Sequence, residues 1–287
     1  MSDVLVLGAG LMGTQVARCL ARSGLDVAVW NRTPERAAPL AGDGIELHST
    51  PAQAFASAPL VVSVLASTEA LRSVLARTEG ADLSRVTLVN LTTGTPDDAV
   101  QTKWWADEHG VAYLDGMISG RPGTAGTDQM HIAVAGPEAA WSAHRDTLAR
   151  LSPAVHHTGE DVVVPSVLGL ACTGTFFLST LGAFVEAAAF ASAYGIAPDQ
   201  VAAEIPRYLD RVATEVEGFT ALMNAGDFVT PHASTDVYAD ALEAAASSMA
   251  SVGQPGHVTR GAIESLRVAQ DAGRGGESPA VVFDVLT

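Results

Sequence analysis

The chain has 287 residues, of which 48% are apolar and 17% charged, and this predicts a folded protein of one large or two medium domains. Acidic residues outnumber basic ones by 32 to 16, and the net charge of −16 excludes a large nucleic-acid-binding surface. The two cysteines, Cys19 and Cys172, cannot build a disulfide framework. Because the chain opens on a strand-like run without a basic segment, we expect no signal peptide and a cytoplasmic protein.

The first half alternates short β-branched runs with alanine-rich stretches of helical period. Strands are expected at 4–7, 27–30, 60–65, 86–90, 111–115, 129–135 and 154–158, and helices at 11–23, 34–42, 51–58, 69–78, 97–109 and 137–150. The first four runs are almost continuously apolar, as in strands that are covered on both faces. This order predicts a parallel sheet with right-handed helical crossovers.

After about residue 160 the pattern becomes helical. A long helix is expected at about 165–194, followed by helical stretches at 199–225, 231–252, 255–272 and 277–286. We therefore predict an α/β domain over 1–162, an all-α domain over 163–287, and a long helix that joins them. The apolar run 168–185 reaches the lower length limit of a membrane span, but its hydroxyl side chains and the following Glu186 favour a helix buried in a core or a dimer.

A glycine motif directly follows the first expected strand and opens the first helix. It comprises Gly8, Gly10 and Gly13, with Leu11 and Met12 between them. The first glycine permits a tight turn, the second lets backbone approach a pyrophosphate, and the third lets helix and strand pack closely. The helix N-terminus then offers free N–H groups to phosphates. The sequence therefore predicts a Rossmann domain that binds a dinucleotide.

The end of the second strand favours the phosphorylated dinucleotide NADPH over NADH. An acid usually stands there to accept hydrogen bonds from the ribose hydroxyls of NAD. This chain has Asn31, Arg32 and Thr33 instead, followed by Arg36. Arginines pair readily with a 2′-phosphate, and no acid is present to repel it.

The carboxyl ends of the next two strands should also line the cofactor. Leu65, Ala66 and Ser67 follow the run at 60–65, while Asn90 and Thr92 stand at the end of the run at 86–90. Some of these hydroxyls are equally suited to helix capping.

Four stretches together resemble the imine reductases, a branch of the β-hydroxyacid dehydrogenase superfamily. They are GAGLMG at 8–13, WNRTP at 30–34, VNLTTGTP at 89–96 and LDGMISGRP at 114–122. The resemblance covers essentially the full length of the chain. It implies NADPH-dependent reduction of a C=N bond to an amine. It also implies a homodimer in which the helical domain is swapped between subunits and the active site lies at their interface.

The hydroxyacid dehydrogenases of the same superfamily are the competing interpretation. Their chemistry uses a lysine early on the long helix, because alcohol oxidation needs a group that accepts the hydroxyl proton. Lys103 is the only lysine of this chain, so that mechanism in its usual form is excluded. A carbonyl or 3-hydroxyacid oxidoreductase with another proton relay stays open, as does an NADPH-binding protein without catalysis.

Imine reductases often carry Asp or Tyr near the start of the long helix as a proton donor, whereas 166–175 has neither here. A protonated iminium needs only hydride, orientation and exclusion of water. The remaining proton-donor candidates are Thr173, Cys172, Ser119 and Tyr238, and the substrate is expected against Met117, Arg121, Phe176 and Phe177. No metal site is expected, since the adjacent His156 and His157 point to opposite faces of a strand.

Overall fold

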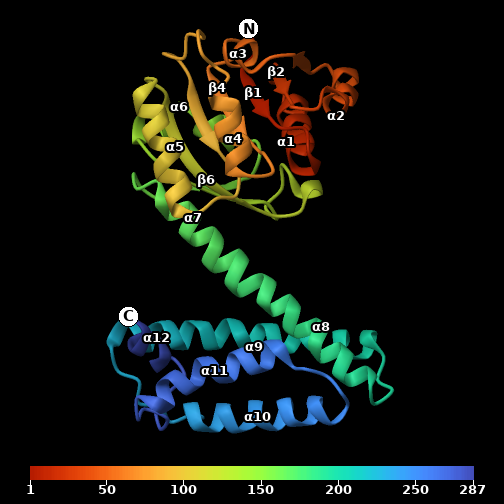
Figure 1. Ribbon diagram of the computed structural model, residues 1–287, viewed down its shortest axis with the longest axis vertical. Helices are drawn as coiled ribbons and strands as arrows, with labels where there is room; N and C mark the ends of the chain where they lie inside the picture. The colour runs from red at the N-terminus through yellow and green to blue at the C-terminus, as the bar shows by residue number, and fades with distance from the viewer. The chain divides into compact units, whose positions relative to one another are not determined.

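The computed structural model describes all 287 residues and divides into two compact units, Met1–Thr175 and Phe176–Thr287. The first unit is built on one β-sheet with helices, and the second is entirely helical (Figure 1). The predicted fold class is confirmed. The division between the units falls inside the continuous helical run Val163–Ser192, and the domain boundary expected at residue 162 stays a prediction.

An eight-stranded sheet forms the centre of the first unit, in the order β3-β2-β1-β4-β5-β6-β7-β8. The strands are β1 Val4–Leu7, β2 Val27–Trp30, β3 Glu46–His48, β4 Leu60–Ser63, β5 Thr87–Asn90, β6 Ala112–Ser119, β7 His131–Ala135 and β8 Ala154–His157. Strands β2 and β3 lie on one side of β1, and strands β4 to β8 lie on its other side. The reversal between β1 and β4 is the position at which open α/β sheets bind ligands, outside the carboxyl ends of the strands.

The sheet departs from the expectation at two strands. Strand β6 pairs with β7 antiparallel, whereas every other neighbouring pair is parallel. The connection between them contains only the 3₁₀ turn η2 Pro122–Thr124, and a parallel return requires a longer crossover, usually an α-helix. Strand β3 was not predicted, because its three residues lie at the sheet edge and are mostly exposed.

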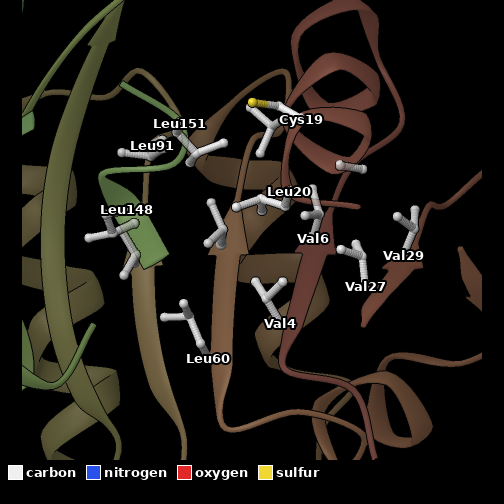
Figure 2. Close-up of a cluster of buried hydrophobic side chains, with 14 of the residues drawn as sticks. Val4, Val6, Cys19, Leu20, Val27, Val29, Leu60, Leu91, Leu148 and Leu151 are labelled. Atoms are coloured by element: carbon white, nitrogen blue, oxygen red, sulfur yellow. The ribbon is translucent and has the colours of Figure 1, made fainter. Parts of the chain in front are cut away.

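Helices cover both faces of the sheet. They are α1 Leu11–Arg22, α2 Pro34–Ala37, α3 Pro51–Phe55, α4 Thr68–Leu75, α5 Pro96–Glu108, α6 Glu138–Leu148 and α7 Val163–Leu168, with the 3₁₀ turn η1 Ala38–Asp43. Strand β1 shows why both faces are apolar: Val4 and Val6 pack in a cluster with Leu20 and Leu148 (Figure 2), whereas Leu5 belongs to a cluster on the opposite face. All four residues of β1 are fully buried, which fixes the strand that carries the glycine motif.

The second unit consists of helices α8 Ser179–Ser192, α9 Pro198–Ala225, α10 Thr235–Ser251, α11 His257–Asp271 and α12 Val281–Leu286. Its buried apolar cluster is small: Phe228, Ala269, Ala280 and Val281 form its centre. No residue of helix α9 is fully buried: Phe219, Leu222 and Met223 pack against this cluster partly buried, while Leu209, Val212 and Val216 are exposed. A single copy of this unit therefore leaves substantial apolar area in contact with water.

Of the two environments expected for the long helix, the core of the single chain is wrong, and burial in a dimer stays a prediction. Helix α7, the π-helical segment η3 Gly169–Leu178 and α8 form one run, and the most apolar part of it has no buried residue. Phe176 and Phe177 are each 53% exposed, and Leu178 is 56% exposed. By length and composition alone, Val163–Ser192 could cross a membrane, since an 18-residue stretch of it has a mean hydropathy of 1.7.

Candidate nucleotide site

The glycine motif forms the turn from β1 into α1 that the sequence predicts. Gly8 has a φ of +111°, and a Cβ atom there would lie 2.3 Å from the carbonyl oxygen of Val64. A Cβ atom on Gly13 would lie 2.2 Å from the carbonyl oxygen of Gly8. Both positions therefore exclude larger residues, since real contacts of a Cβ atom are never so short. This close packing holds the N-terminus of α1 against the ends of β1 and β4.

Gly10 has a different environment, because a Cβ atom there would meet nothing within 4 Å. It is the N-cap residue of α1, and no side chain caps this helix. The first N–H groups of the 12-residue helix are therefore free to bind an anion, and the helix dipole adds positive potential at the same point. The turn has the open space and the donors that a dinucleotide pyrophosphate requires.

The side chain of Asn31 connects the end of β2 to this turn through hydrogen bonds. The Oδ1 atom of Asn31 accepts a hydrogen bond from the Ala9 N–H group at 2.9 Å, and its Nδ2 group donates to the Thr33 carbonyl at 2.7 Å. Asn31 thereby fixes the loop that carries Arg32 and Thr33. Both polar groups of the Asn31 side chain are satisfied within the protein.

A cavity of about 350 Å³ lies over the turn, within the size range of small-molecule sites. The predicted residues that line it are Gly8, Gly10, Leu11, Met12, Gly13, Asn31, Arg32, Thr33, Arg36, Leu65 and Ala66. It is also lined by residues that the sequence analysis did not single out, which are Trp30, Val64, Ala70, Ser73, Val74 and Arg77. Ala70, Ser73 and Val74 lie on α4, and Arg77 follows two residues beyond its end. Their spacing of i, i+3, i+4 and i+7 is the sequence signal that could have identified them.

Three predicted cofactor residues do not line this cavity. Ser67 caps α4 by accepting a hydrogen bond from Ala70 N–H at 3.2 Å. Thr92 is buried, and its hydroxyl bonds to Ser63 Oγ at 2.9 Å and accepts from Leu65 N–H at 3.0 Å. Its role in the structure is to hold the Leu65 loop that borders the cavity.

Asn90 is buried as well and belongs to a polar cluster that joins the carboxyl end of β5 to the first half of β6. Its Nδ2 group donates to Asp115 Oδ1 at 3.1 Å, and the Tyr113 hydroxyl donates to the same oxygen at 2.6 Å. The other carboxylate oxygen accepts from Ser166 Oγ on α7 at 3.0 Å. Burial raises the pKa of Asp115 to about 6, although these hydrogen bonds act in the opposite direction. Asp115 was not predicted from the sequence, although Met117, Ser119 and Arg121 of the same motif were, because its burial against β5 and α7 arises only in the fold.

The catalytic and substrate candidates are divided between the two units. Met117 and Ser119 lie on β6, Arg121 is exposed in the loop after it, and Cys172 and Thr173 lie on η3. These five belong to the first unit, whereas Phe176, Phe177 and Tyr238 belong to the second. Within the first unit, the long helix passes β6 closely, since a Cβ atom on Gly169 would lie 3.4 Å from Met117 Cβ.

The sheet order, the glycine turn and the arginine-lined cavity define a dinucleotide-binding oxidoreductase. Comparison with known families agrees with this class in both halves of the chain. The NAD-binding domain of 6-phosphogluconate dehydrogenase matches residues 3–159, and the C-terminal domain of the NADPH-dependent reductive aminase-like proteins matches residues 173–287. The chain therefore belongs to the imine reductase and reductive aminase family of NADPH-dependent oxidoreductases, as its motifs predicted.

Individual relatives agree with this assignment. The imine reductase of a Pseudomonas species is 29% identical and superposes with a TM-score of 0.94 over 100% of this chain and 99% of its own. The imine reductase of Myxococcus stipitatus in complex with NADP+ is 27% identical, with a TM-score of 0.92 over 99% and 100% of the two chains. The NADPH-dependent reductive aminase of Aspergillus oryzae is 31% identical over 131 residues, which are 46% of this chain and 44% of that protein. Most curated relatives align over only 37–56% of their own length, whereas the L-threonate dehydrogenase of Cupriavidus necator, 24% identical, aligns over 99% of this chain and 95% of its own.

Proposed function

We propose that this protein reduces the C=N bond of a cyclic imine or iminium with NADPH. The observation that carries the choice of C=N over a hydroxyacid is the composition of the long helix over 163–178. Its only ionisable side chain is that of Cys172, and there is no lysine after Lys103. Oxidation of an alcohol needs a base for the hydroxyl proton, whereas a protonated iminium carbon is already electron-poor.

The residues around the cavity suit the parts of NADPH. The free N–H groups at the start of α1 would hold the pyrophosphate, and Arg32, Thr33 and Arg36 would hold the 2′-phosphate. The cofactor supplies hydride when it is bound. Asn31 would act indirectly, by keeping the loop after β2 at a fixed distance from the glycine turn.

The substrate residues remain those of the sequence analysis. We propose that Met117 gives the substrate an apolar contact and that Arg121 orients substrates that carry an anionic group, while Phe176 and Phe177 stay predicted substrate residues. The proton donor would be one of the hydroxyl or thiol groups of Thr173, Cys172, Ser119 or Tyr238.

We further propose that the protein is a homodimer whose helical units are exchanged between subunits. Support comes from exposed apolar side chains on two helices of the single chain. One set is Leu170, Phe176, Phe177, Leu178, Leu181 and Val185, and the other is Tyr208, Leu209, Val212 and Val216. Apolar patches of this kind mark sites of association. Light scattering on the purified chain should give twice the mass of one copy, and a monomeric mass would contradict the proposal.

The function is tested by NADPH oxidation, followed spectroscopically, with a panel of cyclic imines and with ketone–amine pairs. We expect turnover of at least one cyclic imine and no oxidation of 3-hydroxyacids with NADP+. Oxidation of a 3-hydroxyacid without any imine turnover would favour the alternative, a hydroxyacid oxidoreductase with another proton relay. In that case Arg121→Ala should raise the KM for the acid. Tight NADPH binding without any turnover would favour a non-catalytic protein.

A further inference from the structure

We propose that Arg77 is a third cation of the nucleotide cavity and that it contributes to selectivity for the 2′-phosphorylated dinucleotide. The proposal rests on the proposed NADPH function and extends it to a residue outside the Asn31–Arg36 loop. Arg77 stands two residues beyond the end of α4, far from that loop in the sequence. In the fold it lines the same cavity as Arg32 and Arg36.

The backbone and the neighbouring ring both fix the position of Arg77. Its N–H group donates to the Val74 carbonyl at 3.0 Å, which continues the helical turn beyond α4. Its guanidinium carbon lies 6.0 Å from the centroid of the Trp30 ring, in the range of a cation–π contact. Trp30 is the last residue of β2 and directly precedes Asn31. The guanidinium is thus held beside the loop that would receive the 2′-phosphate.

The charges around the cavity favour a doubly charged anion. Its lining includes Arg32, Arg36 and Arg77 but no Asp or Glu. None of the three arginines forms an ion pair. A chain of net charge −16 that leaves three cations unpaired around one cavity provides an attractive site for a phosphate monoester.

An arginine on α4 itself shows the contrast. Arg72 on α4 pairs with Asp98 at 2.7 Å and with Glu69 at 3.2 Å, and it does not line the cavity. Its charge is compensated within the protein, whereas that of Arg77 is available to a ligand.

The test is calorimetric titration of the full chain with adenosine 2′,5′-bisphosphate and with 5′-AMP, which differ only in the 2′-phosphate. The variants are Arg77→Ala, Arg77→Lys and, as control, Arg85→Ala, an exposed arginine outside the cavity. We expect Arg77→Ala to weaken binding of the bisphosphate by roughly ten-fold, as for one charge-assisted contact. The affinity of Arg77→Ala for 5′-AMP should change less than about two-fold. The affinity of Arg77→Lys for the bisphosphate should lie between those of the wild type and Arg77→Ala, and Arg85→Ala should bind both nucleotides like the wild type.

Two results would overturn the proposal for Arg77. An Arg77→Ala variant with unchanged affinity for both nucleotides would show that the residue takes no part. Equal loss of affinity for both nucleotides would show that it contacts the adenosine rather than the 2′-phosphate. A wild-type chain that does not distinguish the two nucleotides would instead remove the NADPH function on which the proposal rests. Because the titration needs no substrate, its outcome is independent of imine turnover.

Discussion

Asn31 accepts a hydrogen bond from the backbone of Ala9 at 2.9 Å, and this contact ties the end of β2 to the glycine turn after β1. The same side chain donates to the Thr33 carbonyl at 2.7 Å. One residue therefore sets the distance between the expected pyrophosphate site and the expected 2′-phosphate site. An aspartate at this position would keep the first hydrogen bond, lose the second, and add a negative charge.

The Asn31→Asp variant should therefore lose its preference for NADPH. A carboxylate at the end of β2 repels a 2′-phosphate but accepts hydrogen bonds from ribose hydroxyls. We expect the KM for NADPH to rise about ten-fold or more, as for one unfavourable charge contact, while the KM for NADH stays equal or falls. Steady-state kinetics with both coenzymes measure this ratio. An unchanged ratio would mean that the 2′-phosphate binds elsewhere.

Gly10 and Gly13 offer a matched pair of substitutions that separates binding from folding. Gly13→Ala places a Cβ atom 2.2 Å from the Gly8 carbonyl oxygen and should cost about 1–3 kcal/mol in the free energy of unfolding, which lowers Tm by several °C. Gly10→Ala meets nothing within 4 Å and should leave the Tm of the nucleotide-free protein nearly unchanged. Its methyl group should nevertheless weaken NADPH binding, because it would stand where the pyrophosphate approaches. Thermal denaturation and nucleotide titration of both variants check this; strong NADPH binding by Gly10→Ala would contradict it.

Asp115 should make stability depend on pH in the acidic range. Burial raises its pKa to about 6 against an unfolded value near 3.9, so the folded state binds the proton more tightly than the unfolded state. The resulting stabilisation is complete below about pH 4 and is lost as the pH rises through about 6. It amounts to as much as about 3 kcal/mol for a shift of about two units.

Asp115→Asn tests this because it keeps the Oδ1 acceptor for Asn90 and Tyr113 and removes the titration. Urea unfolding gives the free energy of unfolding of both proteins. The value for the wild type minus that for the variant should decrease as the pH is raised from 4 to 7. A difference that stays constant across this range would show that Asp115 has an ordinary pKa in the folded protein.

Glu186 should stabilise the second unit by capping α11. It accepts hydrogen bonds from Thr259 N–H at 3.0 Å, from the Thr259 hydroxyl at 3.0 Å and from Val258 N–H at 3.3 Å. Burial alone would raise the pKa of Glu186, but these hydrogen bonds outweigh it and the pKa is lowered. The stabilisation is therefore present above the unfolded pKa and is lost as the pH falls through the folded one.

Glu186→Ala should lower the free energy of unfolding by about 1–2 kcal/mol at neutral pH, as for loss of a helix cap. Glu264→Ala is the control, because Glu264 is an exposed carboxylate of α11 that forms no ion pair or hydrogen bond through its side chain. Denaturant unfolding of both variants at pH 7 measures the difference. Equal effects of the two substitutions would show that the cap contributes nothing.

The elements with strong local signals were predictable from the sequence. Continuous apolar runs define β1, β2, β4 and β5, and the position of the glycine motif after β1 identified the turn that the structure shows. Strand β3 has three residues with little burial, so it carries no such signal. The antiparallel pairing of β6 with β7 depends on the shape of the connecting loop, which hydrophobic periodicity does not report.

The site was predictable where one local motif carries it and less so where distant segments meet. Arg32 and Arg36 follow β2 directly, whereas Arg77 reaches the same cavity from the end of α4. Asn90 and Thr92 have the polar side chains expected of ligand contacts, yet they serve the protein itself by holding Asp115 and the Leu65 loop. A polar residue at a strand end therefore predicts where the side chain lies better than it predicts whether the side chain contacts a ligand or the protein itself.

The most direct test of the account is the rate of NADPH consumption by the purified chain with a cyclic imine, compared with its rate of NADP+ reduction by 3-hydroxyacids. We predict NADPH-dependent formation of the cyclic amine, detected by mass spectrometry, and no hydroxyacid oxidation. Oxidation of a hydroxyacid, or a preference for NADH in imine reduction, would contradict the central claim that this fold delivers hydride from NADPH to an electron-poor C=N carbon without a lysine.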